Sequence, residues 1–100
     1  MVIAEVSVVP MGTKTPSASK YVAKALKVLR EEKGVKYQLT AMGTLLEGEL
    51  DKVLEAAKKM HECLFDEDVK RVVSTIRLDE RRDKMLTISY KVESVMKKLE

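Results

Sequence analysis

The sequence predicts a protein of the α+β class, a β-α-β-β-α-β sandwich followed by an extra C-terminal helix. Some segments alternate apolar and polar residues, as strands do. Between them lie segments in which apolar residues recur every three or four positions, as in helices. Two right-handed crossovers in this order of elements produce the ferredoxin-like arrangement. The length of 100 residues is that of one domain, so we expect residues 1–100 to form a single ligand-binding unit.

The first strand is expected over residues 1–10, a β-branched stretch bounded by Pro10 and Gly12. Its even positions are all apolar and its odd positions are mixed, which suits a sheet that helices cover on one side only. A loop rich in Gly, Pro and Thr follows, and an amphipathic helix then begins at Pro16 or Ser17 and ends near Gly34.

Residues 35–42 alternate again, Gly43 interrupts them, and residues 44–48 predict a short third strand. The join at Gly43 is either a tight hairpin or a bulge in one bent strand. A second helix is expected over about residues 49–64, a fourth strand over 69–79 and a charged turn over 80–84. Apolar residues at helical spacing predict the last helix: Ile88, Val92, Val95, Met96 and Leu99.

Composition narrows the function. The net charge of +3 comes from interleaved basic and acidic residues, so no polyanionic partner is required. Among the aromatic residues only Tyr37 falls on an expected strand, which argues against nucleic-acid binding. No stretch is apolar enough to span a membrane, and the first ten residues lack the features of a signal peptide. We therefore expect a cytoplasmic protein, and the absence of Asn with abundant Lys, Glu and Arg is typical of a thermophilic source.

The sequence contains only weak motifs for metal binding and for catalysis. His61 and Cys63 stand two positions apart on an expected helix, so they face different directions, and no second Cys/His pair accompanies them. No serine lies in a nucleophile motif, and one histidine is the only candidate base. We expect neither a metal nor a cofactor, and no enzymatic activity.

The segment over residues 37–49, YQLTAMGTLLEGE, is the most distinctive. Two glycines, Gly43 and Gly48, bracket a short strand that carries Thr44 and Glu47. This pattern is typical either of a hairpin followed by a helix start or of the polar lining of a small-molecule pocket.

The chain resembles the thiamine-binding, YkoF-like family of small proteins. The resemblance rests on VSVVPMGTKTPSASKYVAKAL at residues 6–26, VKYQLTAMGTLLEGE at 35–49, RVVSTIRLDERRDK at 71–84 and the final KVESVMKKL, with MGTLLEG as its most specific element. It implies a ferredoxin-like fold, assembly into dimers and tetramers through the sheets, and non-catalytic binding of thiamine or its hydroxymethylpyrimidine portion. The implied binding residues are Ser7, Tyr37, Met42, Gly43, Thr44 and Glu47.

An aminopyrimidine suits these residue types. A carboxyl such as that of Glu47 can pair with a ring nitrogen and an exocyclic amine, and the hydroxyl of Thr44 can add a hydrogen bond. Met42 and Tyr37 can pack on the ring faces. We weigh three alternatives: a salt bridge between Glu47 and Arg77, a regulatory module that binds another metabolite or an anion at the helix start over residues 15–19, and a purely structural protein.

Self-association is expected from the sheet. Two helices cover one face, and the other face should display Ile3, Val9, Met42 and Val73 among Ser7, Gln38, Thr40 and Thr75. That mixture favours a homo-oligomer, a dimer or a dimer of dimers, with the ligand between subunits. The C-terminal helix can pack on this face or on a neighbour.

Overall fold

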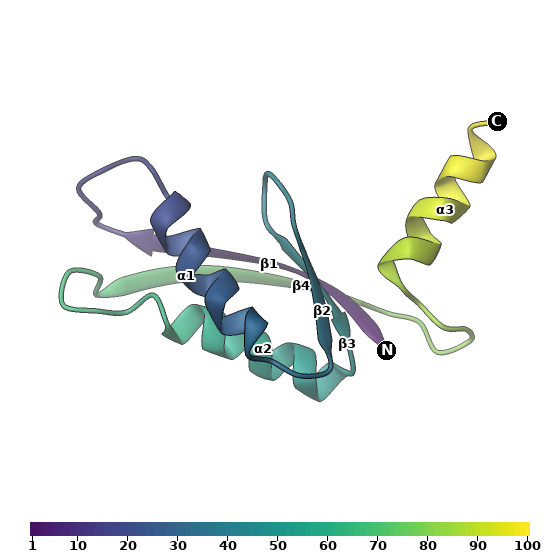
Figure 1. Ribbon diagram of the computed structural model, residues 1–100, viewed down its shortest axis with the longest axis horizontal. Coiled ribbons are helices and arrows are strands. Elements are labelled where there is room, and N and C mark those ends of the chain that lie inside the picture. The colour runs from purple at the N-terminus through teal and green to yellow at the C-terminus, as the bar shows by residue number, and fades with distance from the viewer.

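A four-stranded antiparallel sheet with two helices on one face forms the body of the protein (Figure 1). The computed structural model describes residues 1–100, and its elements are β1 (Val2–Met11), α1 (Ser19–Arg30), β2 (Val35–Leu39), β3 (Thr44–Gly48), α2 (Leu50–Glu62), β4 (Arg71–Glu80) and α3 (Ile88–Lys98). The strand order is β2-β3-β1-β4. This order confirms the ferredoxin-like α+β prediction with its extra C-terminal helix.

The join at Gly43 is a hairpin, since β2 and β3 pair antiparallel with Leu39 opposite Thr44. β2 consequently ends at Leu39, three residues earlier than predicted. Residues 40–43 form the turn because the Thr40 hydroxyl bonds to the backbone of Gly43. The prediction that Thr40 and Met42 face outward from a strand is therefore wrong. Glycine is required at Gly34, where φ is +82° in the connection from α1 to β2.

The core lies between the sheet and the two helices. The even positions of β1 point into it, as the alternation predicts, and meet Leu46 of β3. Each helix contributes one apolar stripe, with Ala25 and Leu29 from α1 and four residues from α2: Val53, Ala56, Ala57 and Met60. The opposite face of the sheet carries no helix, so the prediction of a sheet covered on one side is confirmed.

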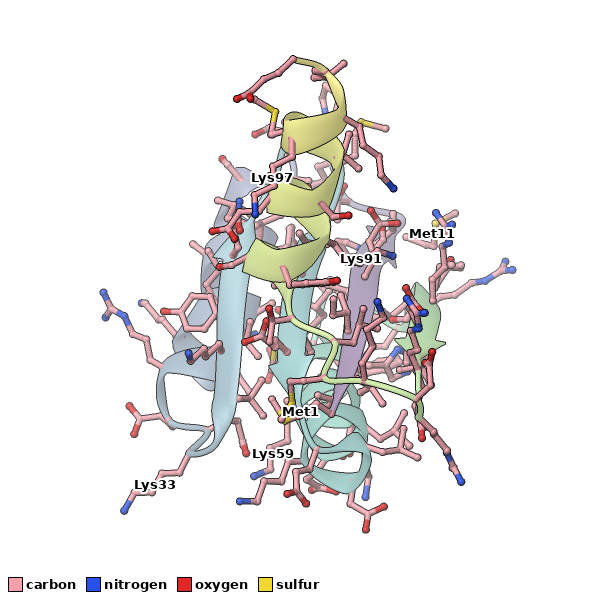
Figure 2. All side chains as sticks on the ribbon, turned by 90° about the vertical axis from the view of Figure 1, so that its right-hand side faces the viewer. Met1, Met11, Lys33, Lys59, Lys91 and Lys97 are labelled. Carbon is pink, nitrogen blue, oxygen red and sulfur yellow. The ribbon has the colours of Figure 1, made fainter.

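Helix α3 stands away from this body (Figure 1). It buries none of its residues, and its apolar residues Val92, Val95 and Met96 are each more than half exposed, as is Leu99 directly after it. Figure 2 shows its last turns rising beyond the ends of the strands, with the labelled Lys97 on this part of the helix. The helix therefore does not cover the open face of the sheet in its own chain.

No helix of the structure combines the length and the apolar character needed to cross a membrane.

Candidate functional site

A cavity of about 180 Å³ opens between the start of α1, the β2–β3 turn and the second half of β1. The cavity exists because the two strands differ in length. Pairing between β1 and β3 ends at Val6 and Thr44, whereas β1 continues to Met11 beside β4. The turn over residues 40–43 leaves the sheet at this level and forms one side of the cavity.

The walls of the cavity are uncharged. Its apolar surface comes from α1 and from the helix-facing side of the sheet, with Ala18, Val22, Leu39 and Met60 among the contributors. No Asp, Glu, Lys, Arg or His lines it. Because burying a charge without a partner is costly, such walls favour a neutral group with few polar atoms.

Thr44 is the most informative side chain in this cavity. It is only 4% exposed, and its hydroxyl makes no hydrogen bond to any protein group. No fully enclosed side-chain oxygen or nitrogen in the structure lacks a partner, so this hydroxyl is not fully enclosed, and Thr44 lines the cavity. An accessible hydroxyl that makes no hydrogen bond within the protein is free to bond to a ligand in the cavity.

The turn beside Thr44 is held by the hydroxyl of Thr40. That hydroxyl donates to the Gly43 carbonyl oxygen at 2.7 Å and accepts the Gly43 N–H at 3.1 Å. Gly43 allows close approach to β1, since a Cβ at this position would lie 3.2 Å from the Val6 carbonyl oxygen. The turn is thereby fixed against β1 and forms one wall of the cavity.

The structure brings four of the six predicted binding residues together around this cavity: Ser7, Met42, Gly43 and Thr44. Met42 is 86% exposed and lies in the turn. Tyr37 lies opposite Leu46 on the helix side of the sheet, beside Lys27 and Arg30 of α1, and does not line the cavity. Sequence reasoning missed Thr40 and Val8, which also line it, because nothing in a sequence says where pairing between two strands ends.

Glu47 lies apart from the cavity, on the open face of the sheet. The residue is 6% exposed, and its carboxylate accepts the backbone N–H of Ile88, the first residue of α3, at 2.6 Å. An acidic group at the start of a helix is favoured by the helix dipole. The alternative partner, Arg77, pairs with Glu5 at 3.6 Å.

A second cavity, of about 300 Å³, lies at the start of α1 and is lined by Lys14, Lys20 and Asp68 among others. Helix α1 begins at Ser19, later than the predicted start at Pro16 or Ser17, and its N-cap Ala18 provides no side-chain cap. No buried polar side chain points into this second cavity. It is the place that the predicted anion site at residues 15–19 would occupy.

The residues with metal or nucleophile chemistry are dispersed. No group of three or more His, Cys, Asp and Glu gathers anywhere in the structure. Burial raises the pKa of the Cys63 thiol, which also donates to the Met60 carbonyl oxygen at 3.1 Å. His61 Nδ1 and Ser74 Oγ are 2.6 Å apart and link α2 to β4, away from the cavity.

Comparison with known proteins places this chain in a family. A model of the thiamine-binding protein family matches residues 4–96. The protein YqgV of Bacillus subtilis is 47% identical over 103 residues, covering 100% of this chain and 99% of the relative. The crystal structure of MJ1052 from Methanocaldococcus jannaschii, 47% identical, superposes with a TM-score of 0.86 over 94% of each chain.

A more distant structure shares the fold. It is a Thermotoga maritima protein provisionally assigned to thiamine biosynthesis or salvage, 23% identical, with a TM-score of 0.77 over 94% of this chain and 97% of the other. The family model and the close relatives cover almost the whole sequence. The chain belongs to the thiamine-binding protein family.

Proposed function

We propose that this protein binds thiamine through its pyrimidine ring in the cavity beside Thr44, without transforming it chemically. The observation that carries the proposal is the hydroxyl of the buried residue Thr44, which has no protein partner, is not fully enclosed and belongs to a cavity lined mainly by apolar groups. Membership of the thiamine-binding family supports this choice of ligand.

The character of the cavity favours one end of thiamine. Its volume of about 180 Å³ is below the roughly 300–1,000 Å³ of sites that enclose a drug-sized ligand, so it suits a single ring. Its walls are uncharged, which favours the neutral aminopyrimidine over the cationic thiazolium. We place the pyrimidine inside and the thiazolium at the mouth, near the exposed Met42.

Binding without catalysis fits the lining. General acid–base or nucleophilic steps require groups such as His, Cys or a carboxylate near the reacting atoms, and the cavity lining contains none of these. A single half-buried thiol, Cys63, suits a reducing compartment such as the cytoplasm. We therefore propose a role in holding or delivering the ligand.

Isothermal titration with thiamine, thiamine phosphates and free hydroxymethylpyrimidine tests the proposal. We expect the free pyrimidine to bind, and Thr44→Val to weaken its binding by about tenfold, since a neutral hydrogen bond contributes roughly 0.5–1.5 kcal/mol. Thr75→Val is the matched control, because Thr75 lies exposed on the open face of β4. Absence of heat with all three compounds would refute the assignment.

We also propose that the protein is a homo-oligomer, a dimer or a dimer of dimers, built through the open sheet face and α3. The accessible surface is 7324 Å², whereas a compact monomer of 11.3 kDa exposes about 5,700 Å². The difference of about 1,600 Å² is twice the roughly 800 Å² that each partner buries in a standard interface. The apolar stripe of α3 and the open face residues Val9 and Val73 supply the surface to be covered.

Light scattering coupled to size exclusion tests this second proposal at micromolar concentration. A dimer or tetramer mass is the expected result, and truncation after residue 86 should shift the mass downward. A mass near 11.3 kDa for the full chain would refute it. All the contacts to the pyrimidine proposed above come from residues of one chain, so titration and light scattering test the two proposals separately.

A further inference from the structure

The second half of β1 has a free edge. Its residues after Val6 pair with β4 through Met11, but β3 ends opposite Val6. Figure 1 shows the β2–β3 hairpin turning away from β1 at this level. The backbone groups on that edge of β1 therefore have no strand to bind, and the edge borders the cavity.

In an antiparallel sheet, successive residues of a strand direct their N–H and C=O groups alternately to the two neighbouring strands. This alternation identifies which residue of β1 directs its backbone groups to the free edge. Thr40 N–H donates to the Gly43 carbonyl oxygen at 2.8 Å, so odd-numbered residues of the β3 segment bond toward β2 and even-numbered ones bond toward β1. Thr44 and its partner Val6 therefore bond to each other. Two positions further along β1, Val8 directs its N–H and its C=O to the same side, beyond the end of β3.

Pro10 supports this orientation independently. It lies within β1 opposite Val72 of β4 although it has no N–H. Proline is tolerated in a strand only where its missing N–H faces no partner strand. Pro10 therefore belongs to the same free edge as Val8 and leaves that edge without a donor at its own position. Val8 is then the one residue on the free part of β1 that offers both a donor and an acceptor.

We infer that the Val8 backbone binds the ligand ring in the way that a neighbouring strand would, with Thr44 as the side-chain contact. This inference rests on the proposed function. The ligand class is a planar heterocycle with an acceptor nitrogen next to an exocyclic amine, as in an aminopyrimidine. The Val8 N–H donates to the ring nitrogen, and the amine donates to the Val8 carbonyl oxygen. The pairing resembles the addition of a peptide strand to a sheet edge.

Two consequences for specificity follow. The recognition uses backbone atoms, so it depends on the length difference between β1 and β3 rather than on a charged side chain. It also requires at least one amine hydrogen on the ligand. An N,N-dimethylamino analogue of hydroxymethylpyrimidine should therefore bind at least tenfold more weakly than the parent compound.

Amide hydrogen exchange measured by NMR tests the inference directly. In the free protein the Val8 amide should exchange at least tenfold faster than those of Ser7 and Val9, which bond to β4. Saturation with hydroxymethylpyrimidine should slow exchange at Val8 at least tenfold and leave Ser7 unchanged. If the compound binds and the Val8 amide is either protected beforehand or unaffected, the inference is refuted and the cavity assignment stands.

The variant Val8→Pro removes the N–H that the pairing with β4 does not use, and it also replaces the Val8 side chain, which packs on both core clusters. It should retain the fold, as Pro10 does naturally, and lose tenfold or more in affinity for hydroxymethylpyrimidine. If it does not fold, the exchange experiment on the unaltered chain decides. If the unaltered chain binds neither thiamine nor hydroxymethylpyrimidine, the proposed function and this inference both fall. Full affinity in a folded Val8→Pro protein would overturn the inference alone.

Discussion

Replacing Glu47 separates two roles that a buried carboxylate can have. Glu47 is the only charged side chain inside β3, and its carboxylate accepts the Ile88 N–H at 2.6 Å. If that contact is its main role, Glu47→Ala should loosen α3 and leave the affinity for thiamine unchanged. If Glu47 instead contacts the ligand, the affinity should fall.

The expected magnitude follows from how α3 is attached. A hydrogen bond to a charged group contributes about 1.5–3 kcal/mol, which corresponds to a roughly 10- to 150-fold change in the docking equilibrium of α3. The other attachments are few. Lys91 pairs with Asp79 at 2.5 Å, but both are exposed, and such pairs contribute about 0–1 kcal/mol. Leu86 is buried just before the helix. Glu47→Gln keeps an acceptor oxygen and should have a smaller effect.

Hydrogen exchange of the α3 amides measures the docking, and thiamine titration measures the binding. Glu49→Ala is the matched control, because Glu49 is exposed two positions away and makes no side-chain cap. We expect faster exchange across α3 for Glu47→Ala only, with the same affinity in all variants. A tenfold loss of affinity in Glu47→Gln with unchanged protection of α3 would show that the carboxylate contacts the ligand, contrary to this reasoning.

Three further predictions concern stability and reactivity. Gly48→Ala should destabilise the fold by about 1–3 kcal/mol in urea unfolding, because a Cβ there would lie 2.8 Å from the Gly34 carbonyl oxygen; an unchanged midpoint would contradict it. Cys63 should react slowly with iodoacetamide at pH 8 until the protein unfolds, since burial raises its pKa. The Val69 and Asp68 N–H groups lower the pKa of Asp66 from its ordinary 3.8, so the stability that it contributes is present above about pH 4 and lost as the pH falls through the lowered value. Asp66→Asn should therefore flatten the acid limb of a thermal unfolding series, and an identical limb would argue against this contribution.

Much of the fold is predictable from periodicity. The alternation in residues 1–10 correctly separates the buried even positions of β1 from the mixed odd ones, and the helical spacing places Leu29 and Val53 in the core. The end of β2 is less predictable, because alternation continues through Thr40 to Met42 while the Thr40 hydroxyl closes a turn with Gly43. A side-chain bond three residues along the chain outweighs the pattern there.

The site is predictable only in part. The motif around Gly43 and Thr44 identifies the right region, because glycine permits the close approach to Val6 that forms one wall. The separation of Glu47 from that region follows from register, since residues 44 and 47 of one strand point to opposite faces of the sheet. The hydrogen bond from the Ile88 N–H to the Glu47 carboxylate joins positions 41 apart in the chain, and no local sequence pattern predicts such a contact.

The unequal lengths of β1 and β3 connect the site to the rest of the fold. A third strand two residues longer would pair with Val8, satisfy its N–H and C=O, and leave no free edge at the cavity. The turn over residues 40–43 prevents this extension, because the hydrogen bonds of the Thr40 hydroxyl to the Gly43 backbone hold the chain in a reversal at these residues. The same shortening makes Thr44 the first residue of β3, at the end of the strand that borders the cavity. Ligand binding in this protein would thus take the place of the hydrogen bonds that a complete sheet would make, which explains how a cavity without a single charged side chain can still select a polar ring.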